Sequence, residues 1–420
     1  MMNAEIISVG TELLLGAVVN TDTAIVARAL SELGIDLMHT CVVGDNPQRL
    51  KEAVEGAIAR SGLLIMTGGL GPTADDLTKE TTAAAAGKKL VLHEESLRRI
   101  QNYFNEQHVS ENQAKQAWLP EGCTVLQNDN GTAPGCAFQA ENGCTIIMLP
   151  GPPSELTPML NNYAVPYLKK SQEYTIVSHN VHIYGRGEAP VAQMMDDLMD
   201  SQNPTLAPYA NEGECYLRVT AKAHTHEEAD RMCGPLIQEI RSRLGNFVYS
   251  VDVNSLEELV VKELTEKGKT LATAESCTGG LLSKRITDVS GSSGVFNMGV
   301  VTYANEAKEE LLGVPHETLE QHGAVSEETA RAMAEGIVRR SGSDLGVGIT
   351  GIAGPEGGTP EKPVGLIYIA LSDGENTWVA KRSPIGRTKS RDWHRHCAAS
   401  QALDMVRRYL AGMPVIEVHE

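Results

Sequence analysis

The sequence predicts an α/β protein of three domains: an N-terminal three-layer domain, a small α+β connector and a C-terminal α/β domain. Short aliphatic runs alternate with segments that carry apolar residues at helical spacing, and glycine-rich turns follow several of these runs. The chain has 420 residues, whereas a single hydrophobic core stops growing at roughly 250 to 300 residues. We expect domain boundaries near 1–170, 171–252 and 253–420.

The first domain is predicted from repeated strand-helix-strand units. We expect its sheet to be mainly parallel, with helices on both faces. Gly34 ends the first long helix as a C-cap glycine should. The predicted strands are 4–10, 36–44, 63–69 and 145–149, and the predicted helices are 21–34, 49–62, 95–107 and 154–170.

The texture of the chain changes near residue 173. Alternating β-branched residues predict strands at 175–185 and 215–224, with helices at 189–200 and 227–245, which suits a small α+β module. The βα rhythm then returns in the last domain. Its predicted strands are 270–276, 295–304, 345–351 and 364–371, and its predicted helices include 328–342 and 395–410.

Composition narrows the functional classes. The formal net charge is -18 and no basic block interrupts the acidic residues, which argues against nucleic acid or an anionic membrane as a partner. No stretch is apolar over the roughly 18 residues that a membrane span needs, and we expect a cytoplasmic protein. The eight cysteines are dispersed without metal-ligand spacing, so we expect them to be reduced.

An acidic, glycine-rich segment, MTGGLGPTADDLTKE (66–80), follows a buried strand. Gly69 and Gly71 allow a ligand to approach the backbone, and Asp75, Asp76 and Glu80 cluster at a helix start. The spacing is not that of a phosphate-binding loop with a lysine, so the acidity points to a divalent cation held together with ligand phosphates. The simpler interpretation is a glycine turn followed by an acidic N-cap.

The segment LATAESCTGG (271–280) places hydroxyl and thiol groups at a corner between a strand and a helix. Ser276 is the candidate nucleophile, and the backbone N–H groups from Cys277 to Gly280 are candidate oxyanion donors, with Thr278 and Gly279 also near the substrate. Cys277 itself is interpreted as a packing residue. The alternative is that Ser276 is an ordinary N-cap.

Ser276 needs a base, and no histidine lies near it in the sequence. The candidate is Lys308 in VTYANEAKEELLG, although a solvated helix residue is the usual fate of a lysine. A basic lysine requires a pKa of about 7 to 8 instead of about 10.4, lowered by burial or by cationic neighbours such as Lys284 and Arg285. Tyr303 is placed to orient the proton path.

A second glycine-rich turn, GITGIAGPEGGTPEKPVG, follows the strand at 345–351. We expect Thr350, Gly351 and Gly354 to line a phosphate site, with Lys362 pairing with the phosphate charge. In the connector, the loop YGRGEAP carries Arg186, which we assign to the ligand of the first domain or to a dimer partner.

Together these motifs resemble the CinA family in the family's own order along nearly the whole chain. IISVGTELLLG, TGGLGPTADDLTKE, NGTAPG and LPGPPSEL are similar to its molybdopterin-binding-type domain, and AESCTGG, SGSSGVFNMGVVTYANEAK and GITGIAGPEGG to its nicotinamide mononucleotide (NMN) deamidase domain. The resemblance implies a KH-like connector, although it lacks a basic G-x-x-G loop, so RNA binding is not expected.

The resemblance implies two activities. The C-terminal domain would deamidate NMN with a Ser/Lys pair and no cofactor. The N-terminal domain would hydrolyse ADP-ribose to AMP and ribose 5-phosphate with a divalent metal, Mg²⁺, Co²⁺ or Mn²⁺, with K⁺ as a further candidate. It also implies a homodimer.

Some residue assignments come from the resemblance alone. It adds Thr11 and Glu12 to the first site as ligand-binding residues and makes Asp76 the best candidate for metal or pyrophosphate chemistry. Ala114 stands where the family usually has an arginine. Two alternatives therefore remain: the first domain binds a nucleotide or pterin without turnover, or only the C-terminal domain is active.

Overall fold

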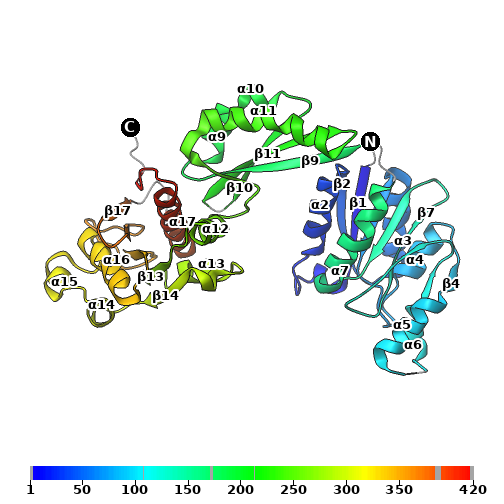
Figure 1. The fold of residues 1–420 in the computed structure, drawn as a ribbon. Helices are drawn as coiled ribbons and strands as arrows, with labels where there is room; N and C mark the ends of the chain where they lie inside the picture. Colours follow the sequence, from blue (N-terminus) through cyan, green and yellow to red (C-terminus); the bar gives the residue numbers. More distant parts are fainter. Residues whose placement is uncertain (1–2, 107, 171–173, 212, 384–388, 417–420) are drawn as a thin grey trace. The chain divides into compact units, whose positions relative to one another are not determined.

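The structure is a computed structural model that describes residues 3–106, 108–170, 174–211, 213–383 and 389–416 (Figure 1). It contains two compact units, one of residues 1–177 with 222–229 and one of residues 178–221 with 230–420. As predicted, the fold is mixed α/β throughout.

The first unit is built on a six-stranded sheet in the order β2-β1-β3-β8-β7-β6. The first four strands are parallel and the last two are antiparallel to their neighbours. The strands of the whole unit are β1 (Asn3–Val9), β2 (Asp36–Val43), β3 (Leu63–Thr67), β4 (Leu90–Leu92), β5 (Trp118–Pro120), β6 (Thr124–Leu126), β7 (Gly135–Gln139) and β8 (Thr145–Leu149), of which β4 and β5 form a separate pair. Its helices are α1 (Thr11–Leu14), α2 (Asp22–Glu32), α3 (Pro47–Arg60), α4 (Thr78–Ala85), α5 (Glu94–Phe104), α6 (Glu111–Lys115), α7 (Pro153–Met159) and α8 (Val165–Lys169).

Alternate residues of the central strands enter two separate cores. Leu63 and Ile65 of β3 pack against α2 and α7, whereas Leu64 and Met66 pack against α3 on the opposite face. Figure 1 shows these helices beside the sheet. A strand buried on both faces reads as a continuous apolar run, which is why 63–69 was recognisable in the sequence. The helices on both faces and the parallel centre of the sheet confirm the prediction for this domain.

Several details of this unit differ from the sequence-based expectation, which did not include strands β6 and β7. The helix predicted at 154–170 contains a π-helical segment at Leu160–Ala164 between α7 and α8. The short pair β4-β5 was not predicted, because three-residue strands carry too little periodicity to detect. The helix expected at 95–107 is α5, and residue 107 lies outside the described residues. Gly34 has a φ of 65° and ends α2 as expected.

The second unit contains two sheets. A four-stranded sheet, β10-β11-β9-β12, forms the connector with α11, and a five-stranded sheet, β14-β13-β15-β16-β17, forms the C-terminal domain. The strands are β9 (Thr175–Ile183), β10 (Thr205–Asn211), β11 (Glu214–Ala223), β12 (Val248–Val251), β13 (Leu271–Glu275), β14 (Phe296–Val301), β15 (Leu345–Gly351), β16 (Ile367–Ser372) and β17 (Thr377–Arg382). The helices are α9 (Glu188–Met194), α10 (Asp196–Met199), α11 (His226–Leu244), α12 (Leu256–Lys267), α13 (Leu281–Thr287), α14 (Asn305–Leu312), α15 (His316–His322), α16 (Glu327–Ser341) and α17 (Arg391–Leu410).

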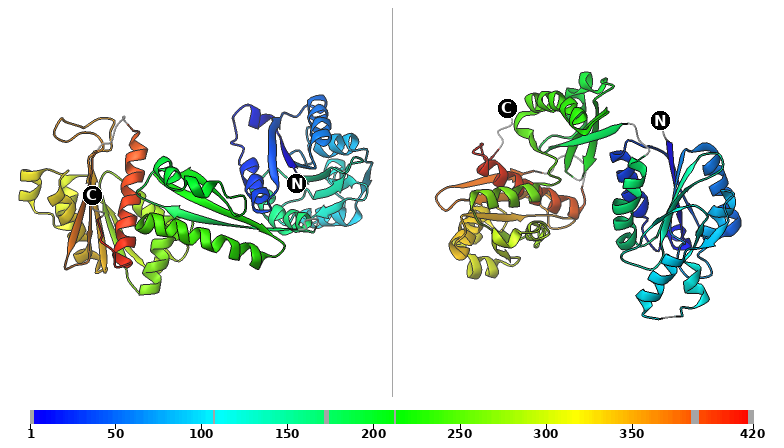
Figure 2. Two further views of the ribbon diagram at one scale, coloured as in Figure 1. Left: turned by 90° about the horizontal axis from the view of Figure 1, so that it is seen from above. Right: turned by 45° about the vertical axis from the view of Figure 1, so that its right-hand side comes forward.

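The C-terminal sheet is again covered on both faces. Helices α12, α13 and α17 bury one face, with Leu271 and Val347 in that core, and α14 and α16 bury the other, with Ala272 and Ala274. The views in Figure 2 show α17, near the end of the chain, lying against its face of the sheet. Strands β14, β13 and β15 are parallel, so their carboxyl ends share one edge of the sheet.

Several predicted elements of this unit differ in bounds from those of the structure, and two of the differences are large. The strand expected at 295–304 ends at Val301, which leaves Tyr303 in the loop before α14. The helix expected at 189–200 is divided into α9 and α10. Within the described ranges, no helix is both long and apolar enough to cross a lipid bilayer.

Candidate active sites

Ser276 and Lys308 meet at the carboxyl end of the C-terminal sheet. Ser276 directly follows β13, and its backbone N–H donates to Ile349 O of the neighbouring strand at 2.9 Å. Lys308 lies on α14, and its Nζ is 3.4 Å from Ser276 Oγ. The sequence placed these residues 32 positions apart, and the parallel pairing of β13 with β14 brings them together.

The corner that carries Ser276 is held by Glu275. This side chain has 0% exposed surface and serves as an internal cap for the start of α13. Its Oε2 accepts from Gly280 N at 3.0 Å and Leu282 N at 3.1 Å, and its Oε1 accepts from Ser283 N at 2.8 Å and Ser283 Oγ at 2.7 Å. A carboxylate at a helix N-terminus satisfies free N–H groups and interacts favourably with the helix dipole.

Lys308 is almost completely buried, with 1% of its surface exposed. Its Nζ contacts Thr302 O at 2.9 Å and Tyr303 O at 3.2 Å besides Ser276 Oγ. Within the part of the chain that the structure describes, no carboxylate forms an ion pair with it. Burial therefore lowers the pKa of Lys308 below its usual value, and the more distant Cys277 and Glu306 oppose that shift only in part.

A cavity of about 260 Å³ opens above Ser276 and Lys308. Tyr303, Thr350, Gly351 and Gly354 line it, as the sequence predicted, and Ala324, Val325 and Glu356 complete the wall. Thr350 is fixed because its Oγ1 donates to Ala324 O at 2.6 Å.

Arg391, at the first position of α17, also lines this cavity and was not predicted. Its NH1 donates to Gly354 O at 2.7 Å and its NH2 contacts Tyr303 OH at 3.2 Å. The predicted helix began at residue 395, so its true first turn was not recognised as part of the site. The charged run RDWHRH before the apolar periodicity was the available signal.

Several predicted residues of this site lie elsewhere. Lys362 does not line the cavity, because its Nζ donates to His322 O at 2.7 Å. Lys284 is exposed and pairs with Asp288, whereas Arg285 is buried and pairs with Glu257 at 2.7 Å, so neither acts on Lys308.

Fewer backbone N–H groups are available to bind an oxyanion than the sequence predicted. Gly279 N donates to Ser276 O and Gly280 N donates to Glu275, so these N–H groups are already used. Thr278, Gly279 and Gly280 do not line the cavity, and the carbonyl of Thr278 accepts from Arg395. Cys277 does line it, and burial raises the pKa of its thiol to about 12, which fits its interpretation as a packing residue.

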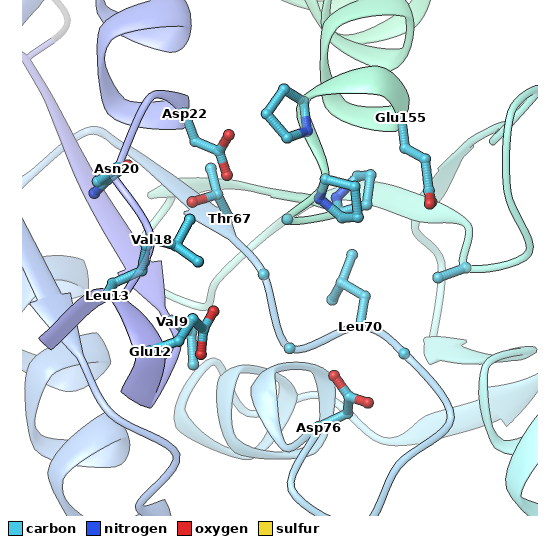
Figure 3. Close-up of a pocket in the computed structure, with 18 of the residues that line it drawn as sticks. Val9, Glu12, Leu13, Val18, Asn20, Asp22, Thr67, Leu70, Asp76 and Glu155 are labelled. Atoms are coloured by element: carbon cyan, nitrogen blue, oxygen red, sulfur yellow. The ribbon is translucent and has the colours of Figure 1, made fainter. Parts of the chain in front are cut away.

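The first unit has its own cavity of about 480 Å³ at the carboxyl ends of β1, β3 and β8. Gly69 and Gly71 form part of its floor, and Gly68 and Gly69 have positive φ values of 87° and 66°. Figure 3 shows that carboxylates from separate segments surround this cavity. They belong to Glu12, Asp22, Asp76 and Glu155.

Only part of the predicted first site is brought together. Glu12 and Asp76 line the cavity, but Asp75 and Glu80 do not. Glu80 instead pairs with Lys115 at 3.5 Å, and Thr11 exchanges hydrogen bonds with Asp45. The predicted metal set Asp75, Asp76 and Glu80 is therefore not assembled, and the described residues contain no group of three or more acidic, histidine or cysteine side chains that could hold a metal by themselves.

The carboxylates that do face the cavity are hard oxygen donors, which suit Mg²⁺ or Mn²⁺ when ligand phosphates complete the coordination. Asp76 is the best placed of the predicted residues for this role. A divalent ion there would neutralise phosphate charge and polarise a phosphoryl oxygen.

Asp22 and Glu155 were not predicted for this site. Asp22 was interpreted as part of the helix 21–34, yet only 8% of its surface is exposed and burial raises its pKa to about 6. Glu155 lies in LPGPPSEL, which was recognised only as a motif. Ala114 lies in α6 and does not line the cavity, whereas its neighbour Lys115 donates to Asp76 O at 2.6 Å.

These observations define a class: an α/β protein with a cavity in each of two domains, both at the carboxyl ends of the parallel strands of a mixed sheet, which is where open α/β folds bind ligands. Family models match the chain in three consecutive parts. They are described as a probable molybdopterin binding domain (residues 5–170), the damage-inducible protein CinA KH domain (178–250) and the CinA C-terminal domain (253–410).

The chain belongs to the CinA family. A CinA-like protein of Desulfovibrio desulfuricans is 53% identical over 414 residues, which cover 99% of this chain and 97% of the relative. A CinA-like protein of Kosmotoga olearia is 50% identical over 97% of this chain and 99% of its own. Among solved structures, a competence/damage inducible protein of Agrobacterium tumefaciens is 41% identical, with a TM-score of 0.35, over 37% of this chain and 93% of its own.

Proposed function

We propose that the C-terminal domain hydrolyses the carboxamide of NMN to give nicotinate mononucleotide and ammonia. The observation that carries this proposal is the environment of Lys308 Nζ, which has three polar neighbours: Ser276 Oγ at 3.4 Å and two backbone carbonyls. A neutral amine has two N–H donors and one lone pair. The two carbonyls take both donors, and the lone pair is left for the Ser276 hydroxyl proton.

The reaction follows from this arrangement. Ser276 Oγ attacks the carboxamide carbon as Lys308 accepts its proton, and the carbonyl oxygen becomes an oxyanion near the N–H group of Cys277, which lines the cavity. Lys308 returns the proton to the leaving nitrogen, and ammonia departs. Water then attacks the acyl-enzyme in the same way, which releases the carboxylate and restores Ser276.

Arg391 supplies the charge that a mononucleotide substrate requires. Its guanidinium lies on the cavity wall and is held by neutral partners, Gly354 O and Tyr303 OH. Guanidinium groups bind phosphate through paired N–H donors. We assign the 5′-phosphate to Arg391, in place of Lys362.

The test is ammonia release from NMN by the full-length protein and by Ser276→Ala, Lys308→Met and Arg391→Gln. Loss of general base catalysis costs about 10² to 10⁴ in rate, so Lys308→Met should lose at least 100-fold in kcat. Arg391→Gln should chiefly raise KM, whereas Lys362→Gln, the matched control, should leave both constants unchanged. Ammonia release by Ser276→Ala at the wild-type rate would overturn the mechanism.

We also propose that the first unit hydrolyses ADP-ribose to AMP and ribose 5-phosphate with a divalent metal. Four carboxylates line its cavity, and within the described residues no lysine or arginine does. A diphosphate entering such a cavity would be repelled unless a cation accompanies it. This charge arrangement supports metal dependence, and Asp76 would share the ion with the phosphates.

The pair Asp76→Ala and Asp75→Ala tests this second function. These neighbours have the same charge, but only Asp76 lines the cavity. Asp76→Ala should lower metal-dependent release of AMP at least tenfold, and Asp75→Ala should not. If the wild-type protein binds ADP-ribose with metal but releases no AMP, the first unit is a binding module without turnover.

A further inference from the structure

A third cavity lies within the second unit, between the connector and the C-terminal domain. It has a volume of about 330 Å³, which is in the range that small-molecule ligands occupy. The connector contributes residues 184–188 after β9, together with Ala210, Gly213 and Glu214. The C-terminal domain contributes Arg382 at the end of β17 and Trp393 and Cys397 of α17.

Two arginines, Arg186 and Arg382, and two glutamates, Glu188 and Glu214, line this cavity. Glu214 is already held by Tyr249 and lies 3.8 Å from Arg285, so the two arginines outweigh the one remaining carboxylate and favour an anion. In the described ranges, neither Arg186 nor Arg382 forms an ion pair with a carboxylate. Arg186 lies over the ring of Phe247 at 4.5 Å, and Arg382 lies over the ring of Trp393 at 5.9 Å and donates to Gln401 at 3.2 Å. Two guanidinium groups with neutral partners that line one cavity are suited to bind phosphate oxygens.

The remaining side chains suit the other parts of a nucleotide. The indole of Trp393 lines the cavity, with Arg382 at 5.9 Å and Lys389 Nζ at 5.3 Å from its ring centroid, so a base that stacks on the indole would replace one of these cations. Glu188 is an exposed carboxylate that also lines the cavity and can accept from sugar hydroxyls. We infer that this cavity binds a nucleoside monophosphate at a site separate from the deamidase cavity.

The walls of this cavity are connected to the Ser276 corner. The first two turns of α17 present Arg391 to the deamidase cavity and Trp393 and Cys397 to the third cavity. Arg395, on the same turns, donates to Thr278 O at 2.7 Å. A ligand that shifts the start of α17 would therefore displace groups on both sides of the helix.

A second connection runs through the connector. Glu214 lines the third cavity and accepts from Tyr249 OH at 2.9 Å. Its Oε1 is 3.8 Å from Arg285 of α13, which donates to Ser400 Oγ of α17 at 2.8 Å. Both helices that flank the Ser276 corner thus contact residues of this cavity or their direct neighbours, and binding is expected to alter deamidation.

The probe is 5′-AMP, which would also be a product of the reaction proposed for the first unit. AMP titrated into the full-length protein should change its tryptophan fluorescence with a saturable dependence, and adenosine at the same concentration should not. The chain has three tryptophans, and only Trp393 lines this cavity. The signal should therefore disappear in Trp393→Phe.

Two substitutions then test the guanidinium groups. Arg382→Gln and Arg186→Gln should each raise the half-saturating AMP concentration at least tenfold, whereas Arg391→Gln should leave it within twofold. Circular dichroism checks that each variant is folded, and the two arginines come from different domains, so one folding defect does not remove both tests. The inference is overturned if AMP gives no signal, if neither substitution weakens it, or if Arg391→Gln alone abolishes it.

Loss of the fluorescence signal in Arg391→Gln alone would place AMP in the deamidase cavity. Only the effect on activity rests on the proposed function. Fluorescence measures binding without any turnover, so failure of the deamidase proposal and failure of this site are distinguishable. If the protein deamidates NMN, AMP should change kcat or KM for NMN in the wild type, and this effect should be absent in Arg382→Gln.

Discussion

Replacing Glu275 by glutamine tests whether the Ser276 corner depends on one internal carboxylate. Glutamine has almost the same shape, but one of its two terminal groups donates instead of accepting. The best orientation keeps the oxygen on Gly280 N and Leu282 N and turns the amide nitrogen toward Ser283, where the hydroxyl can accept but the backbone N–H cannot. One buried donor is then left without a partner.

The magnitude follows from these contacts. An orphaned buried N–H costs about 1 to 3 kcal/mol, and weakening two charge-assisted hydrogen bonds to neutral ones costs about 1 kcal/mol each. The sum, about 3 to 5 kcal/mol, corresponds to roughly a 100- to 5,000-fold increase in local opening. We therefore expect much faster deuterium exchange at residues 280–283 in Glu275→Gln.

The assay is hydrogen exchange by mass spectrometry on the full-length protein, with NMN deamidation measured on the same samples. Glu310→Gln is the matched control, because Glu310 is exposed on α14. Activity of Glu275→Gln should fall at least tenfold because Ser276 adjoins the disturbed segment. Unchanged exchange of these amides would refute the reasoning, whatever happens to the activity.

Three further predictions follow from the titratable groups and the fixed turns. The kcat for NMN deamidation should rise with pH through the lowered pKa of Lys308, because the base must be neutral. The low kcat of Lys308→Met should not show that rise. A pH-rate profile between pH 6 and 10 checks both expectations. Burial raises the pKa of Asp22 to about 6 in the folded state, so ionisation of this side chain disfavours folding as pH rises through that value. Asp22→Asn should therefore raise the melting temperature at pH 8 and lose this advantage below about pH 4. Thermal melts across that pH range test this prediction. A Cβ at Gly336 would lie 2.2 Å from Leu312 O, so Gly336→Ala should destabilise the packing of α16 against α14 by about 1 to 3 kcal/mol, detectable by urea unfolding against Ala332→Gly as a comparison.

The sequence was sufficient to predict the alternating strands and helices, because apolar periodicity is a local signal. It also paired Ser276 with Lys308, and the structure places these side chains 3.4 Å apart because the parallel pairing of β13 with β14 brings together the segments that follow the two strands. Their catalytic roles are proposed. The two helix divisions, at the π-helical segment and between α9 and α10, were not predictable, because both preserve the apolar spacing on either side.

The residue proposed to bind the phosphate could not be identified from the sequence. Lys362 was chosen because it lies near the glycine turn in sequence, but its amine is held by His322 O. Arg391 reaches the cavity only because α17 packs along the sheet, a contact between segments far apart in the chain. Likewise, Asp75 and Asp76 are adjacent residues of the same type, and only the geometry of the turn determines that Asp76 faces the first cavity.

The burial of Lys308 has a practical consequence for chemical labelling. A lysine whose pKa is lowered by burial is normally more reactive than other amines toward acylating reagents, since only the unprotonated form attacks them. Here 99% of the side chain is covered, and the approach leads through a cavity of about 260 Å³ past Ser276. Bulky amine-reactive reagents should therefore label the exposed lysines first, whereas a compact electrophile that fits the cavity should meet the serine before the lysine and mark the protein at Ser276.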